Sequence, residues 1–155
     1  MPYEKKSDKD RELFRKWFSD PHPQIKYFSA AELLTKTDKG KNSVPPIELW
    51  ANILPTIQIL DRLRDVLGYP IHLHSVYRNK AYNASVDGAK DSMHLYFNAV
   101  DFSGSKGTYR DWYRTLLALI QTENLKVGGL AQYPDDNFVH LDTRTLWPDK
   151  GRWIK

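Results

Sequence analysis

The sequence predicts an α+β domain in which helices pack on one face of an antiparallel sheet. Segments with helical spacing of apolar residues come first, and segments that alternate apolar and polar residues come later, with one helix between them. That order is typical of a sheet whose helices are gathered on one face. The chain has 155 residues, of which 41% are hydrophobic, so it is long enough to bury one core.

The first two helices are predicted near the N-terminus. In residues 1–20, which are highly charged, four apolar residues recur at the spacing of one helical face: Leu13, Phe14, Trp17 and Phe18. The PHPQ sequence that follows interrupts this pattern. Ser29 and Glu32 have the spacing of a capping box, which predicts the start of a second helix in residues 28–34.

Two longer helices and a short one follow. Residues 47–70 predict a long amphipathic helix, which Pro55 kinks or divides and which ends near Gly68. Residues 79–92 predict a short helix and a loop. Residues 109–124 predict a helix whose buried stripe is formed by Trp112, Leu116, Leu119 and Ile120.

The alternating segments predict four strands. They lie in residues 71–78, 97–104, 126–133 and 138–142, and the first has an irregular end. The PDDN sequence between the last two strands predicts a turn. In each of the second and fourth strands one face is apolar and the other carries polar side chains.

Composition excludes some classes of protein. The chain has no cysteine, so disulfides and thiolate ligands are excluded, and a bound metal needs histidine or carboxylate ligands. The net charge of +4 is spread along the chain, which makes a nucleic-acid binder a weak alternative. No apolar run is long enough for a bilayer. The first residues lack a signal peptide, so we expect a cytoplasmic protein, or one released by lysis or carried on a virion.

Three residues of the second half form a candidate metal site. Asp101 and His140 lie on the polar faces of two predicted strands, and His94 lies just before the first of them. If the strands are neighbours, these side chains share one surface. Two histidines and an aspartate with a fourth position open are a ligand set of catalytic zinc, which promotes amide hydrolysis. The alternative interpretation is that His94 and Asp101 form a structural hydrogen bond.

Two segments resemble the zinc D-Ala-D-Ala carboxypeptidase family. SVYRNKAYNASVDGAKDSMHLYFNAVDF (75–102) contains YR, N, GA and S-x-H, followed after six residues by D. VGGLAQYPDDNFVHLDTR (127–144) contains GG, a YP turn and FVH-x-D. The resemblance implies the fold that these peptidoglycan peptidases share with D-Ala-D-Ala dipeptidases and the hedgehog domain. We therefore divide the chain into a charged helical extension, residues 1–27, and a zinc peptidase domain, residues 28–155.

The resemblance also implies roles for individual residues. It makes His94, Asp101 and His140 the ligands of Zn²⁺. Arg78 matches the family arginine that stabilises the substrate carbonyl or holds a substrate carboxylate, tasks that suit a guanidinium.

Four more residues are candidates for contacts with the substrate or with the ligands. Ser92 would position the substrate peptide, and Asp142, on the same strand face as His140, would support that ligand. Tyr77 is a candidate for the wall of the substrate groove, or for the core. His74 is a candidate substrate contact or proton carrier, although a structural role is the commoner one for a strand histidine.

The general base departs from the family pattern. Many members have a carboxylate three residues before the last histidine, but this chain has Asn137 there, and an amide cannot accept the proton. We expect Asp136, or Asp135, to act as the base from the turn. The alternative is a module that retains zinc and binds cell wall or a protein partner without catalysis.

The expected function is hydrolysis of peptidoglycan stem peptides next to a D-amino acid, by a carboxypeptidase or an endopeptidase of the kind found in phage endolysins. The expected partner is the peptidoglycan peptide, with no nucleic acid and no membrane, and we expect a monomer.

Overall fold

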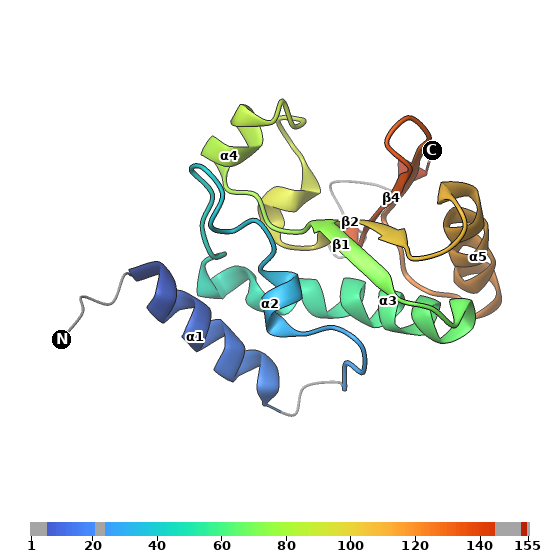
Figure 1. Cartoon of the computed structure of the whole chain (residues 1–155), viewed down its shortest axis with the longest axis horizontal. Coiled ribbons are helices and arrows are strands. Elements are labelled where there is room, and N and C mark those ends of the chain that lie inside the picture. Colours follow the sequence, from blue (N-terminus) through green and yellow to red (C-terminus); the bar gives the residue numbers. More distant parts are fainter. Residues whose placement is uncertain (1–5, 21–23, 145–152, 155) are drawn as a thin grey trace.

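The computed structural model describes residues 6–20 and 24–144, and the backbone of residues 153–154. Within these residues one sheet has the strand order β1-β2-β4-β3-β5 (Figure 1). The strands are β1 (Ile71–Ser75), β2 (Ala99–Gly104), β3 (Gly129–Tyr133), β4 (Phe138–Asp142) and β5 (Trp153–Ile154). The first four pair antiparallel, as predicted, whereas the two-residue β5 pairs parallel with β3.

The helices confirm the α+β class. They are α1 (Lys6–Ser19), α2 (Ala30–Leu33), η1 (Ile47–Asn52), α3 (Ile53–Leu67), α4 (Lys80–Ser85), η2 (Met93–Tyr96) and α5 (Tyr109–Thr122), where η marks a 3₁₀-helix. α3 and α5 contact each other and both contact β2, and α4 lies on the other side of the sheet from α3 (Figure 1). None of the helices in the described part of the chain has the length and apolar character needed to cross a membrane.

The long helix predicted for residues 47–70 consists of two pieces. Its first six residues form the 3₁₀-helix η1, and the α-helix begins at Ile53. Pro55 therefore stands in the first turn of α3, where its missing N–H removes no intrahelical hydrogen bond. α3 ends at Gly68, whose φ of 76° is the left-handed conformation typical of a helix C-terminus. The sequence left open whether Pro55 kinks the helix or divides it, and the structure shows that it lies at the junction of η1 and α3.

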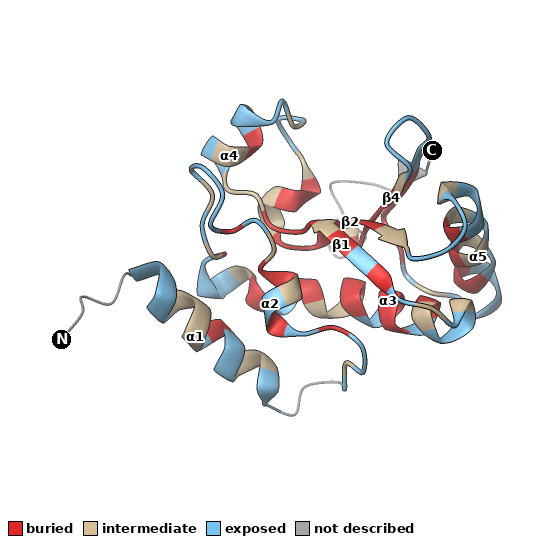
Figure 2. Cartoon of the chain, viewed as in Figure 1, coloured by how far each residue is buried: buried red, intermediate tan, exposed pale blue. Residues whose placement is uncertain are grey.

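The N-terminal helix packs against the core of the domain. The side chain of Phe14 on α1 is fully buried, and its ring lies edge-on to Trp50 and to Phe97 at centroid distances of 5.4 and 5.8 Å. The exposed side of α1 faces away from the sheet, whose strands are buried along most of their length (Figure 2). The division of the chain at residue 28 stays a prediction.

The capping box predicted for Ser29 and Glu32 is confirmed. Ser29 and Glu32 form the capping box of α2: the backbone N–H of Glu32 donates to Ser29 Oγ at 3.2 Å, and that of Ser29 donates to Glu32 Oε1 at 3.1 Å.

The structure also shows the irregular end of the first strand. The register of β1 on β2 shifts between Leu73 and Ser75, which places Ser75 opposite Asp101.

Candidate metal centre

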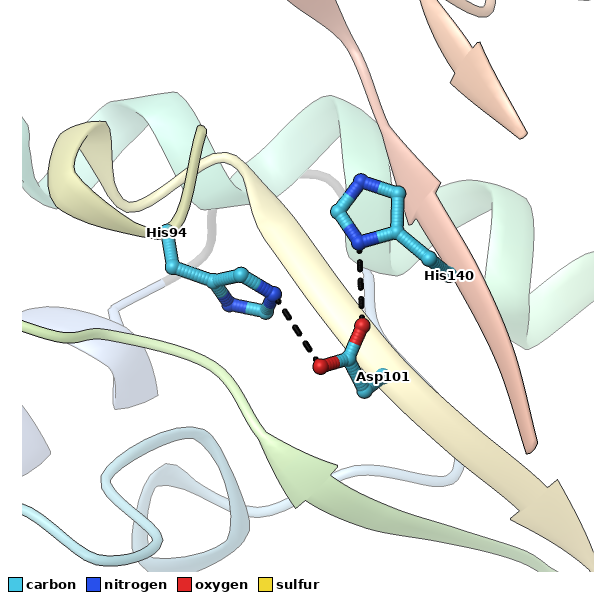
Figure 3. A group of neighbouring side chains, drawn as sticks. All are labelled: His94, Asp101 and His140. Atoms are coloured by element: carbon cyan, nitrogen blue, oxygen red, sulfur yellow. Dashed lines mark hydrogen bonds and ion pairs between the residues drawn. The ribbon is translucent and has the colours of Figure 1, made fainter. Parts of the chain in front are cut away.

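Strand pairing brings two of the candidate ligands together. β2 and β4 are neighbours in the sheet, and Asp101 lies directly opposite His140. His94 belongs to η2, and the chain then turns at Phe97, which has a φ of 56°, before it enters β2. This short turn folds His94 back over the polar face of the strand that carries Asp101 (Figure 3).

The three side chains converge on one point. His94 Nε2 lies 3.2 Å from Asp101 Oδ2, and His140 Nδ1 lies 2.9 Å from Asp101 Oδ1 (Figure 3). One nitrogen or oxygen atom from each residue lies within 4.8 Å of the other two, and all three residues are buried. Two imidazole nitrogens and a carboxylate oxygen at this spacing suit Zn²⁺, which prefers N and O ligands in tetrahedral geometry when cysteine is absent.

Hydrogen bonds on the far side of each imidazole fix its tautomer. His94 Nδ1 lies 2.7 Å from the backbone carbonyl oxygen of Val76. A carbonyl only accepts, so Nδ1 donates and the lone pair of Nε2 faces Asp101. His140 Nε2 lies 2.8 Å from Asp142 Oδ2, which directs Nδ1 toward Asp101 in the same way. Both rings therefore turn their ligating nitrogens toward one position, as metal-binding histidines do.

The charges of the cluster favour a cation. Burial raises the pKa of Asp101, but His94 and His140 outweigh it and hold that pKa well below the usual range. Burial lowers the pKa of His140, but its hydrogen bonds with Asp101 and Asp142 outweigh this and raise the pKa to about 9. The two carboxylates thus favour positive charge at His140, which either a proton or a metal ion at Nδ1 would supply.

Asp142 is fully buried, and besides its contact with His140 it accepts three hydrogen bonds from Arg144. Arg144 donates to it from Nε at 3.0 Å, from Nη2 at 2.7 Å and from its backbone N–H at 3.0 Å. Gly129, opposite Asp142 on β3, leaves room for this carboxylate, because a Cβ there would lie 2.2 Å from Asp142 Oδ2. The sequence prediction included Asp142 but missed Arg144, although the TR that follows H-x-D was a signal for it.

Arg78 lies beside the cluster and holds three contacts. Its Nε donates to Ser75 Oγ at 3.0 Å, its Nη1 to Asn83 Oδ1 at 3.3 Å, and its Nη2 to Asp101 Oδ2 at 3.2 Å. The shift of register in β1 turns Ser75 toward this arginine. A guanidinium held at the candidate ligand Asp101 adds positive charge to the point where the three side chains meet.

An open cavity of about 480 Å³ leads to the cluster. The three ligand residues line it, as do Arg78, Arg144, Ser92, Tyr133 and Phe138. Of the other predicted site residues, Ser92 lines the cavity and its Oγ accepts from the backbone N–H of His94 at 3.3 Å, while its role toward a substrate stays a prediction.

Four predicted site residues are not among those that line this cavity within the described part of the chain: Asp142, which lies behind His140, and Tyr77, His74 and Asp136. Tyr77 is only 6% exposed and packs edge-on against Phe97. His74 Nε2 shares a hydrogen bond of 2.6 Å with Ser103 Oγ. Asp136 is exposed in the turn between β3 and β4. Their roles in a reaction stay predictions.

Asn137, at the position of the usual acid, makes a structural contact. Its backbone has a φ of 54°, and its Oδ1 accepts from the backbone N–H of Tyr109, the first residue of α5, at 2.8 Å. The first N–H groups of a helix have no intrahelical partner, and the Asn137 amide satisfies one of them. The side chain is thus engaged with the helix.

The fold and the site together define a metal-dependent hydrolase. The sequence matches the family model of peptidase M15 over residues 26–142, and the chain belongs to this family. Its members are metallopeptidases and typically depend on zinc, which agrees with the His-Asp-His cluster. The match also confirms the resemblance that the sequence motifs predicted. A search of curated proteins found no match.

Proposed function

We propose that this protein is a zinc peptidase that hydrolyses peptidoglycan stem peptides next to a D-amino acid. The observation that carries the proposal is the His94–Asp101–His140 cluster, whose two imidazoles have tautomers that turn a ligating nitrogen to the same point. Membership of the M15 family supports a metallopeptidase. The choice of peptidoglycan rests on the motifs shared with D-Ala-D-Ala carboxypeptidases.

The residues of the chain divide the work of hydrolysis. Bound zinc supplies a Lewis acid and lowers the pKa of a coordinated water. Arg78 presents its positive charge where the carbonyl oxygen of the substrate becomes negative. Arg144 lines the same cavity and already holds Asp142, so it keeps His140 in place.

A carboxylate at the rim of the cavity takes the proton in this proposal. Asp87 and Asp91 line the cavity. Asp136, the base expected from the sequence, lies in the turn whose flanking residues Tyr133 and Phe138 line it. Replacing each of the three by asparagine separately identifies the base as the position at which activity is lost with zinc binding intact.

Digestion of purified peptidoglycan tests the proposal. Zinc-loaded protein is incubated with the polymer beside a chelated sample, and the released fragments are identified by mass spectrometry. We expect fragments only in the zinc-loaded sample, and their masses identify the bond and distinguish carboxypeptidase from endopeptidase action. A protein that holds one zinc per chain and releases no fragment would contradict the proposal.

The second candidate is a zinc-containing module that binds cell wall or a protein partner without cleaving it. The observation that favours it is Asn137, which replaces the usual acid and is engaged with α5. Under this alternative zinc has a structural role, and binding to peptidoglycan persists without any released fragment.

Asn137→Asp distinguishes the two candidates. The new carboxylate would accept from the same N–H at the start of α5, and a negative charge at a helix N-terminus is favourable by about 0.3–1 kcal/mol. We therefore expect a small gain in stability, measured by urea unfolding, and no gain in turnover. A severalfold rise in peptidoglycan cleavage would instead identify the native chain as the binding module. Gln132→Glu, at an exposed position of β3 next to this turn, is the control for the added negative charge.

A further inference from the structure

Tyr133 lies on the same face of the sheet as the metal ligands. It is the last residue of β3 and pairs with Phe138 on β4. Two residues earlier on β3, Ala131 pairs with His140. His140 pairs in turn with Asp101 on β2. Residues two apart on a strand point to the same side, so Tyr133 and Phe138 form the row next to His140 and Asp101. The two rows are about 7 Å apart along the strands, a distance that a tyrosine side chain spans.

The ring of Tyr133 is held in place at the cavity. It stacks on Phe138 with a centroid distance of 4.5 Å and an angle of 10° between the planes. Both residues line the cavity that leads to the cluster, and Tyr133 is 38% exposed. The ring is thus held by Phe138 of the neighbouring strand, and Tyr133 borders the space that a substrate would occupy.

The hydroxyl of Tyr133 is available as a donor. Tyr27 uses its hydroxyl in a hydrogen bond to Asp65 at 2.6 Å, but no such bond joins the Tyr133 hydroxyl to a residue that the structure describes. Burial and the charge of Asp101 raise the pKa of Tyr133, and Arg78 lowers it. The phenol therefore lies within the field of the two charged groups of the site and keeps its proton at neutral pH.

We propose that Tyr133 is a catalytic residue whose hydroxyl donates a hydrogen bond to the substrate oxygen that becomes negative during hydrolysis. This inference rests on the proposed peptidase function. The three donor nitrogens of Arg78 already bond to Ser75, Asn83 and Asp101, so the guanidinium has little freedom to follow the substrate. A neutral donor at the rim stabilises charge as it develops, and it costs no pre-existing hydrogen bond.

The first test is Tyr133→Phe in the zinc-loaded full chain. Phenylalanine retains the ring stacked on Phe138, so only the hydroxyl is lost. We expect kcat on the stem peptide to fall about a hundredfold, as for loss of one oxyanion donor, with KM and zinc content within about twofold of the native values. Tyr113→Phe on α5, which packs on the opposite face of the sheet, is the matched control. A native kcat in Tyr133→Phe would overturn the inference.

The second test needs no peptide substrate. Inorganic phosphate is a tetrahedral oxyanion, and its binding to the zinc-loaded protein is measured by calorimetry. We expect Tyr133→Phe to bind phosphate about tenfold more weakly than the native protein and than Tyr113→Phe, since a hydrogen bond to an anion is lost. Equal affinities overturn the inference, and so does a native protein that binds no phosphate. If the native protein binds phosphate but cleaves no peptidoglycan, the proposed substrate is wrong. The role of Tyr133 is then decided by the phosphate affinities of the native protein and Tyr133→Phe.

Discussion

Replacing His94 by alanine is expected to abolish stoichiometric zinc binding and all hydrolysis. His94 is one of the three candidate ligands found among the described residues, and its Nε2 lies 3.2 Å from Asp101 Oδ2. Loss of a residue that merely supports a zinc ligand costs 10–100-fold in affinity, so loss of the ligand itself should cost well over about a hundredfold. Zinc content after gel filtration, measured by mass spectrometry of the metal, gives the result directly.

His72→Ala is the matched control for this variant. His72 is an exposed histidine of β1 and does not belong to the cluster, so its loss should leave one zinc per chain and full activity. His140→Ala should also lose zinc, and it should be less stable than His94→Ala, because it leaves the buried Asp101 and Asp142 without their shared partner. Full zinc content in His94→Ala would mean that the metal site lies elsewhere.

The convergence of the candidate ligands could be predicted from the sequence because strand alternation sets the face on which two of them lie. Asp101 and His140 each stand between apolar residues of a strand, so a sheet buried on one face must turn both toward the other. The sequence could not predict that Asp101 and His140 pair, because the pairing requires β4 to lie next to β2. In the structure β4 lies between β2 and β3. Strand order depends on packing between distant parts of the chain, and alternation contains no information about it.

The general base could not be predicted in the same way. The turn between β3 and β4 offers Asp135, Asp136 and Asn137 in succession, and sequence does not say which way a turn residue points. The positive φ of Asn137 and its bond to the start of α5 decide this for one of them. Tyr77 is a similar case: the sequence left it as a wall of the groove or as part of the core, and its ring is buried and packs edge-on against Phe97.

Gly129→Ala is expected to weaken zinc binding without touching a ligand. A Cβ at this position would lie 2.2 Å from Oδ2 and 2.7 Å from Cγ of Asp142, so the carboxylate must move. Asp142 holds His140 Nε2 at 2.8 Å and receives two side-chain bonds from Arg144, and all three depend on its position. We expect zinc affinity, measured by competition with a chelating dye, to fall by about 10–100-fold, the usual cost of losing the partner of a ligating histidine.

Gly88→Ala is a comparison variant that affects the Arg78 side of the site, whereas Gly129→Ala affects the His140 side. Its Cβ would lie 1.9 Å from Asn83 Oδ1, the acceptor of a bond from Arg78 Nη1. Gly88 therefore leaves space for Asn83, which holds Arg78, just as Gly129 leaves space for Asp142, which holds His140. We expect Gly88→Ala to lower peptide cleavage with zinc affinity close to native, whereas Gly129→Ala lowers both.

A double-mutant cycle tests whether Gly129 acts through Asp142. If the only effect of the added methyl group is to displace the carboxylate, it costs no zinc affinity once Asp142 is already alanine, and the two changes are not additive. Asp142→Ala alone should weaken zinc binding about as much as Gly129→Ala. If Gly129→Ala costs the same factor in both backgrounds, the glycine acts on the metal site by another route, such as a shift of β3 against β4. If Gly129→Ala costs no zinc affinity in the Asp142→Ala background, then Gly129, the second glycine of the GG motif, acts on the metal centre through Asp142. Its missing side chain leaves the space that the carboxylate behind His140 occupies.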